Sequence, residues 1–305
     1  FNHLTRSRCL VVDGKVTNSP RRTLKTETVN KITGEIRPIR IDQARGLYGE
    51  GGDENKLVWG SKWGTVVIAD TLTNLRITLA TEYMPHGEGH SEAETFTNLL
   101  RKHVTKFNGG VDAVLIDGAV QGKAIDTIQT KLGILVIAPP RRASTKRKNA
   151  VPMPHNPGER YEAAVVPYDA KHPARGWACG GPVLIAGGGT LWTQRRLDNG
   201  TLNYTPVTRG QTKRQNYTHA DGTTTYSFTI QLTIETCPDC GQKHTWWESL
   251  TGKKSDRGAK FNRAQYLRGA TPADPEEWSR VYHMRGDVES NNARIEVAWH
   301  GDRMP

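Results

Sequence analysis

Two segments of the chain share one pattern: a short apolar run that ends in an aspartate followed by a glycine. They are LVVDG at residues 10–14 and VLIDG at residues 114–118. Apolar runs of this length are typical of strands that are buried on both faces in the middle of a sheet. If the two strands are neighbours, Asp13 and Asp117 lie side by side at one edge of the sheet and repel each other unless a cation compensates them. Each aspartate alone fits a simple turn, but the duplicated pattern favours a pair that shares a divalent metal such as Mg²⁺.

The excess of basic over acidic residues indicates the class of molecule that the protein binds. Lys and Arg total 42 against 31 Asp and Glu, which gives a net charge of +11 and a pI near 9.5. Such an excess indicates a polyanionic partner, most often nucleic acid, although solubility alone also produces it. A length of 305 residues predicts one large domain, or one domain that carries a sizeable insertion.

Targeting signals are not apparent in the sequence. No apolar stretch approaches the length of a membrane span, and no signal peptide is visible. Four cysteines are too few for a disulfide scaffold in a chain of this length, which predicts a reducing cytosol. The chain begins at Phe1 rather than at a methionine, so we expect further residues upstream.

Alternation and turn residues predict the order of elements in the first half of the chain. After the first aspartate strand we expect a hairpin, a helix capped by Ser91, the second aspartate strand, a further helix and a further strand, which together form a mixed α/β sheet. Asp70 falls at the tip of the hairpin and is not expected to be catalytic, and the glycine-rich residues 46–55 are expected to form a loop. The expected ranges are 63–69 and 75–82 for the hairpin, 91–107 and 124–132 for the helices, and 134–138 for the last strand.

The character of the sequence changes after Pro139. A dense basic run follows, and it is either a solvated linker or a strip that contacts phosphates. Its members are Arg141, Arg142, Lys146, Arg147 and Lys148. Residues 161–250 are rich in Thr, Gly and aromatic residues in alternating patterns, which predicts an all-β insertion made of hairpins. Residues 275–288 then return to helical character.

This last predicted helix carries Tyr282, Arg285 and Glu289 with the spacing Y-x2-R-x3-E. Steps of three and four residues place the three side chains on one face of a helix. The triplet alone also fits an ordinary surface ion-pair stripe. Together with the two strand-end aspartates, Glu289 completes an acidic triad of the kind that holds two Mg²⁺ ions near a scissile phosphate.

These features resemble the DDE transposases of bacterial insertion sequences. In that family the catalytic core has a ribonuclease-H-like fold, and the third acid lies in a Y-x2-R-x3-E-x6-K motif. The first three positions of the motif match the triplet described above, and the two strand aspartates match as well. The fourth position departs from the family, because it is Glu296 rather than a lysine, and the nearest cation is Arg294.

The resemblance implies a DNA transposase with an α/β, ribonuclease-H-like mixed sheet flanked by helices and an all-β insertion. Asp13, Asp117 and Glu289 are then catalytic and hold Mg²⁺ or Mn²⁺ for cleavage of transposon ends and strand transfer to target DNA. Tyr282, Arg285 and the basic run then line the DNA path. The implied assembly is a homodimer bound to transposon-end and target DNA, at the nucleoid in the bacterial cytoplasm.

The resemblance also divides the chain. Residues 1–140 are the first part of the ribonuclease-H-like core, residues 141–270 are the basic linker and the β-rich insertion, and residues 271–305 supply the C-terminal helix of the core. Two alternatives remain. One is a catalytically silent, transposase-derived DNA-binding protein, which the intact triad disfavours. The other is a stand-alone nuclease of the same fold, which the Y-x2-R-x3-E motif and the β-rich insertion disfavour.

Two features of the β-rich insertion call for separate interpretation. Cys237, Cys240 and His244 resemble half of a zinc knuckle, which needs a fourth ligand from Cys9, Cys179 or another histidine, and the alternative is a tight hairpin turn without metal. Cys9 is an unsuitable fourth ligand because it belongs to the first core strand. The adjacent Trp246 and Trp247 are either core residues or, as in related enzymes, include an aromatic that stacks on a base displaced from the DNA end. Strand alternation turns one of the two outward.

Overall fold

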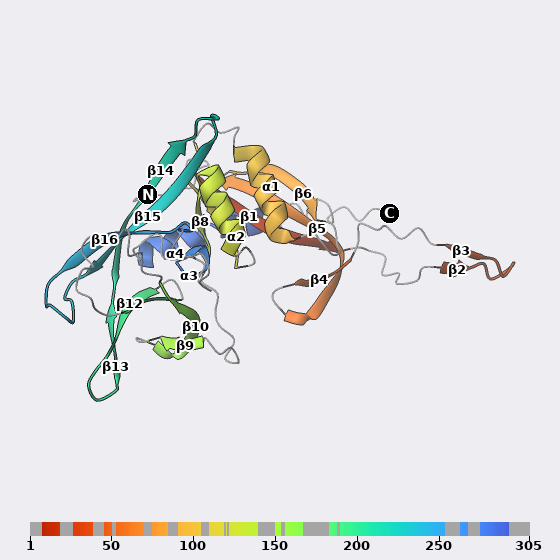
Figure 1. The fold of residues 1–305 in the computed structure, drawn as a ribbon. Coiled ribbons are helices and arrows are strands. Elements are labelled where there is room, and N and C mark those ends of the chain that lie inside the picture. The colour runs from red at the N-terminus through yellow and green to blue at the C-terminus, as the bar shows by residue number, and fades with distance from the viewer. Residues whose placement is uncertain are drawn as a thin grey trace.

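A mixed six-stranded sheet, three smaller sheets and a few helices make up the described parts of this computed structural model (Figure 1). The α/β class with a mixed sheet, which the sequence predicts, is confirmed. The structure describes residues 8–18, 27–38, 46–50, 53–69, 75–84, 91–104, 110–118, 120, 122–139, 150–153, 156–166, 183–187, 190–253, 263–267 and 275–292.

The central sheet combines antiparallel and parallel pairing. Its strands are β1 (Cys9–Asn18), β4 (Gly46–Glu50), β5 (Asp53–Ala69), β6 (Arg76–Met84), β7 (Ala113–Leu115) and β8 (Leu135–Ile137). They follow the order β4-β5-β1-β7-β8, and β6 pairs with β5. β5 runs antiparallel to β1, β4 and β6, whereas β1, β7 and β8 are parallel to one another. The β5–β6 pair is the predicted hairpin, and Asp70 lies outside the described residues.

The first aspartate strand is buried on both faces, as its continuous apolar run predicts. Leu10 and Val12 point into one hydrophobic cluster, while Cys9 and Val11 point into another on the opposite face. Burial of one such aliphatic side chain contributes roughly 1.5–3 kcal/mol, so the alternation fixes which face of β1 each residue occupies.

Helices cover one face of the central sheet (Figure 1). They are α1 (Glu92–Val104), α2 (Gly122–Thr127) and the π-helical turn η3 (Ile128–Leu132). α1 begins where the sequence predicts, because the backbone N–H of Glu94 donates to Ser91 Oγ at 3.1 Å and acidic residues fill the first turn. Its buried side, which includes Phe96 and Leu99, packs against the cluster that holds Leu10 and Val12.

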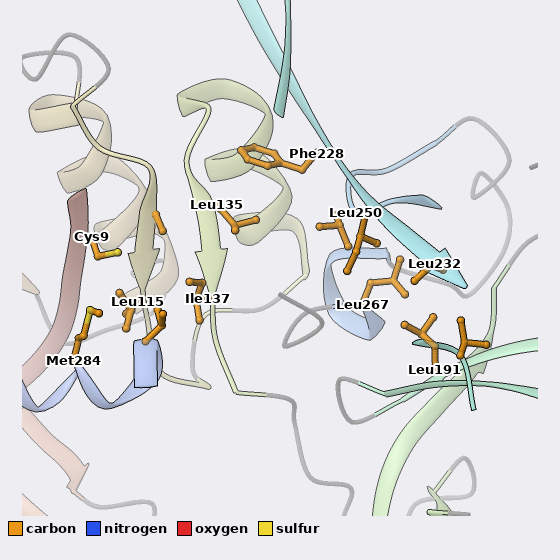
Figure 2. Packing of buried hydrophobic residues seen from close by; sticks show 14 of the residues in the cluster. Cys9, Leu115, Leu135, Ile137, Leu191, Phe228, Leu232, Leu250, Leu267 and Met284 are labelled. Carbon is orange, nitrogen blue, oxygen red and sulfur yellow. The ribbon is translucent and has the colours of Figure 1, made fainter. Parts of the chain in front are cut away.

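The opposite face of the central sheet is covered by residues from much later in the chain (Figure 2). Leu115 and Ile137 of the parallel strands share one cluster with Phe228, Leu232 and Met284. The β-rich insertion and the C-terminal helical segment therefore pack onto the core, the latter through Val281, Met284 and Val288.

Within residues 161–250, where the sequence predicts an insertion made of hairpins, the described elements are all strands. One sheet has the order β13-β12-β11-β10-β9 and the other has the order β14-β15-β16. The strands are β9 (Ala150–Met153), β10 (Asn156–Val165), β11 (Val183–Gly187), β12 (Thr190–Arg196), β13 (Leu202–Pro206), β14 (Thr208–Thr218), β15 (Thr224–Ile234) and β16 (His244–Ser249). The remaining elements are the hairpin of β2 (Glu27–Val29) and β3 (Ile36–Pro38), and the short helix α3 (Arg263–Tyr266).

The predicted loop at residues 46–55 is wrong. Gly46–Glu50 forms β4, and β5 already begins at Asp53. β5 is 17 residues long and extends beyond its pairing with β1, so its first part pairs with β4 instead. Strand preference depends strongly on context, so a glycine-rich composition does not reveal this pairing.

The C-terminal helix is also less regular than predicted. α4 (Pro275–His283) ends before Arg285, and helical residues resume at 286–292. In between, the N–H of Arg285 donates to Tyr282 O at 3.0 Å and the N–H of Val288 donates to Arg285 O at 3.1 Å. These i→i−3 bonds tighten the chain into a 3₁₀-like turn, and Gly286 lowers the local preference for α-helix.

Candidate active site

The two strand aspartates lie level with each other on adjacent parallel strands. In the β1–β7 pair, Leu10 is opposite Val114 and Val11 is opposite Leu115. Continued by two residues, the same register brings Asp13 level with Asp117. Asp13 itself is still in β1, opposite Thr65 of β5, whereas Asp117 follows the end of β7. The parallel β1–β7 pairing ends at Val11 and Leu115, so both carboxylates lie just beyond its carboxyl end, at the same edge of this part of the sheet.

The C-terminal segment reaches this edge through Arg285. Its Nη2 donates to Asp13 Oδ1 at 3.1 Å, and its Nη1 lies 3.6 Å from Glu289 Oε1. Asn292 Nδ2 donates to the second oxygen, Asp13 Oδ2, at 3.4 Å. Arg285 thus links the first strand aspartate to the third predicted acid, although Arg285 and Asp13 are 272 positions apart in sequence.

The electrostatics support the same grouping. Burial raises the pKa of Asp13, the Arg285 charge opposes this shift, and the charges of Asp117 and Glu289 raise the pKa further. Burial acts to lower the pKa of Arg285, but its interactions with Asp13, Tyr282 and Asp117 raise the pKa above the ordinary value. The carboxylates of Asp13, Asp117 and Glu289 therefore share one electrostatic environment, and Arg285 is the cation within it.

The three carboxylates do not close into a compact metal cage. In the described parts of the chain, the only three ligand atoms of acidic, Cys or His residues that lie within 4.8 Å of one another belong to Cys237, Cys240 and His244. Carboxylate oxygens are nevertheless the donors that Mg²⁺ and Mn²⁺ prefer. Three of them with one guanidinium leave a net negative charge, so the chemistry of the donor set fits a hard divalent cation.

Arg285 is incompletely satisfied. Its Nε is buried and has no hydrogen-bond partner among the described residues. Buried donors without a partner are uncommon in folded proteins and often mark a site that a ligand completes.

The glycines that follow the two aspartates have different surroundings. A Cβ atom at Gly14 would lie 2.3 Å from Glu92 Oε1 and 3.0 Å from Lys62 Cε. These two side chains form an ion pair of 2.8 Å at the start of α1. At the equivalent position Gly118, no heavy atom of the described residues lies within 4 Å of such a Cβ atom.

Three contacts at this site were not anticipated from the sequence. They are the hydrogen bond from Asn292 to Asp13, the ion pair between Lys62 and Glu92, and the ion pair between Arg285 and Asp13. The sequence predicts Arg285 on the DNA path instead. Asn292 follows Glu289 by three residues, as Glu289 follows Arg285 by four, so the three side chains share one helical face. This spacing is the sequence signal that could have identified Asn292.

The two tryptophans have different environments. Trp246 is 3% exposed and lies in the core cluster, so the interpretation that it stacks on DNA is wrong. Trp247 is half-buried on the other face of β16, where Lys213 Nζ lies 4.2 Å from the centre of its ring. Tyr282, which was expected on the DNA path, packs half-buried against the core cluster.

Several predicted residues lie outside the described residues. They are the basic run (Arg141, Arg142, Lys146, Arg147 and Lys148), Cys179, Arg294 and Glu296.

Comparisons with known proteins add no family assignment. No protein-family model matches the chain, and no curated protein matches it. In the described residues, none of the helices has the length and apolar character needed to cross a membrane.

Proposed function

We propose that the chain is a DNA transposase that cuts transposon ends and joins the freed 3′-hydroxyl to target DNA in a metal-dependent reaction. The observation that carries the proposal is the level register of Asp13 and Asp117 on parallel strands, with Arg285 linking Asp13 to Glu289. The net charge of +11 supports a polyanionic substrate. These are the residues and the charge that metal-assisted phosphoryl transfer on DNA requires.

The proposed fold of the core is ribonuclease-H-like. The β2–β3 hairpin, strand β4, the β5–β6 hairpin and helix α1 separate the two aspartate strands, and the third acid comes from the C-terminal helical segment. The resemblance to DDE transposases implies the β5–β6 hairpin and α1 between the aspartates, and a β-rich insertion before the third acid.

Asp13, Asp117 and Glu289 would hold Mg²⁺ or Mn²⁺ through their carboxylate oxygens. When bound, the ion would activate the oxygen that attacks the phosphate and stabilise the oxygen that leaves it. Arg285 offsets part of the repulsion among the carboxylates, and its unsatisfied Nε offers a donor at the same edge. The chain's own contribution is positioning and charge neutralisation rather than covalent catalysis.

The test is cleavage by the full-length protein of labelled DNA that carries the inverted repeats flanking its gene. We expect strand cleavage at the repeat boundary in Mg²⁺ and none in EDTA. Tight binding without cleavage would instead identify a silent DNA-binding protein. Cleavage of branched or hybrid substrates regardless of the repeats would identify a stand-alone nuclease.

Trp247 is the aromatic that the proposal assigns to a displaced base. Replacement Trp247→Ala is expected to weaken binding to transposon-end DNA by about 1–3 kcal/mol, because stacking of one base on an aromatic side chain contributes that much. Lys213, above the ring, adds a positive charge beside the same position. Fluorescence anisotropy with end-labelled DNA measures the effect.

Tyr204→Ala is the matched control, because Tyr204 is an exposed aromatic on β13 of the other sheet. Its removal should leave DNA affinity unchanged. Equal losses from both variants would show that Trp247 has no special role at the DNA end.

A further inference from the structure

The turn between β15 and β16 gathers two thiols and an imidazole. The Sγ atoms of Cys237 and Cys240 and a ring nitrogen of His244 all lie within 4.8 Å of one another. Cys240 Sγ and His244 Nε2 are 3.0 Å apart. This cluster belongs to the β-rich insertion and shares no residue with the candidate active site.

The backbone of the turn builds this arrangement. The N–H of Cys237 donates to Gln242 O at 2.9 Å, and the N–H of Gly241 donates to Cys237 O at 2.9 Å. Gly241 has a φ of 69°, a left-handed conformation that glycine adopts without strain. The chain therefore folds back so that Cys240 faces Cys237, while His244 begins β16 opposite Ile234.

The turn is also anchored to the neighbouring sheet. Arg195 of β12 donates from Nη1 to Pro238 O at 2.8 Å and lies 3.0 Å from Asp239 Oδ1. Pro238 and Asp239 stand between the two cysteines, so the contact fixes the segment that carries both thiols.

The chemistry and the spacing fit zinc. Thiolate and imidazole are the ligands that Zn²⁺ prefers, with Zn–S near 2.3 Å and Zn–N near 2.0–2.1 Å. Ligand atoms around a tetrahedral ion of this size are roughly 3.5–3.8 Å apart. Every pair of the three atoms lies within 4.8 Å, and Cys240 Sγ and His244 Nε2 are 3.0 Å apart, so a small shift of the side chains reaches that spacing.

We propose that Cys237, Cys240 and His244 bind one Zn²⁺ ion that fixes the β15–β16 turn against β12. The fourth coordination position is taken by water or by another donor of the chain. Cys9 does not supply it, because its side chain is buried in the central sheet within β1. The ion holds the start of β16, the strand that carries Trp246 in the core and Trp247 beside Lys213.

The test measures metal content and cobalt spectra of the full-length protein, without reference to DNA cleavage. After exposure to zinc and dialysis, we expect one zinc per chain, and loss of that zinc in the double variant Cys237→Ser, Cys240→Ser. Substitution with Co²⁺ should give thiolate-to-cobalt charge-transfer absorption and intense tetrahedral bands. His219→Gln is the control, since His219 lies on the β14–β15 turn of the same sheet, outside the cluster.

A conservative variant separates metal binding from folding. His244→Cys replaces one zinc ligand by another, so it should retain the metal and strengthen the cobalt–thiolate absorption. Zinc retained at full stoichiometry by the double cysteine variant would overturn the proposal. So would a wild-type protein that takes up no zinc while Cys237 and Cys240 form a disulfide, which would identify a redox pair instead.

Discussion

Replacement of Asp117 by asparagine is expected to lower the rate of DNA strand cleavage by on the order of 10²–10⁴-fold. The amide keeps the shape of the side chain but removes one of the charges that would hold the metal. Metal-assisted stabilisation of the transition state is worth several kcal/mol, and each 1.36 kcal/mol corresponds to about tenfold in rate. DNA affinity should change little, because phosphate contacts come mainly from lysine and arginine.

The fold should tolerate this change. The charge of Asp117 contributes to the raised pKa of Asp13, so its removal relieves repulsion at the sheet edge. Single-turnover cleavage of labelled transposon-end DNA in Mg²⁺ measures the rate, and a binding titration without Mg²⁺ measures the affinity.

Asp112→Asn is the matched control. Asp112 precedes the same strand, β7, and its carboxylate pairs with Arg8 at the opposite end of the strand. Cleavage by this variant should match the parent protein. Equal cleavage by parent and Asp117→Asn would remove Asp117 from the active site, whatever its position.

The fold of the core is predictable where burial leaves a periodic trace in the sequence. The run before Asp13 reads as a strand buried on both faces, and its residues do divide between two hydrophobic clusters. Ser91 with acidic residues after it marks the start of α1, and the structure contains that cap. Both signals are local, which is why one sequence suffices to read them.

Features that depend on distant pairing are not predictable in this way. β4 forms because β5 extends beyond β1 and offers an edge, and nothing in the composition of Gly46–Glu50 announces a strand. By contrast, the interruption of the C-terminal helix at Arg285 has a local signal in Gly286, beside the i→i−3 bonds of the turn.

In the candidate site, too, local contacts are predictable from the sequence and distant ones are not. The spacing of Arg285 and Glu289 correctly predicts that the two side chains meet, because i and i+4 positions are neighbours. The hydrogen bonds of Arg285 and Asn292 to Asp13 join residues more than 270 positions apart, and no local pattern encodes them. The resemblance to transposases implied that Arg285 contacts DNA, whereas its partners in the structure are two of the candidate catalytic acids.

The second large effect concerns a buried ion pair that supports the β-rich insertion. Glu248→Gln is expected to destabilise the protein by about 3–5 kcal/mol, because it removes the charge of one partner from a buried ion pair with Arg263. The side chain of Arg263 is 1% exposed and that of Glu248 is 9% exposed. Glu248 Oε1 also pairs with Lys253 at 3.0 Å and accepts from the N–H of Ser249 at 3.2 Å.

Glu235→Gln is the matched control, because it removes the same charge from an ion pair just after the adjacent strand. Glu235 and Lys243 lie 2.8 Å apart, but their side chains are 62% and 60% exposed, so water already solvates both charges. Such surface pairs contribute about 0–1 kcal/mol.

Urea unfolding followed by tryptophan fluorescence measures both variants, and Trp246, two residues before Glu248, reports on this region directly. Equal shifts in the unfolding midpoint would mean that water reaches Arg263 and that burial is not what gives Glu248 its effect. A large shift for Glu248→Gln alone would show that desolvation, rather than proximity of opposite charges, sets the free energy of the pair.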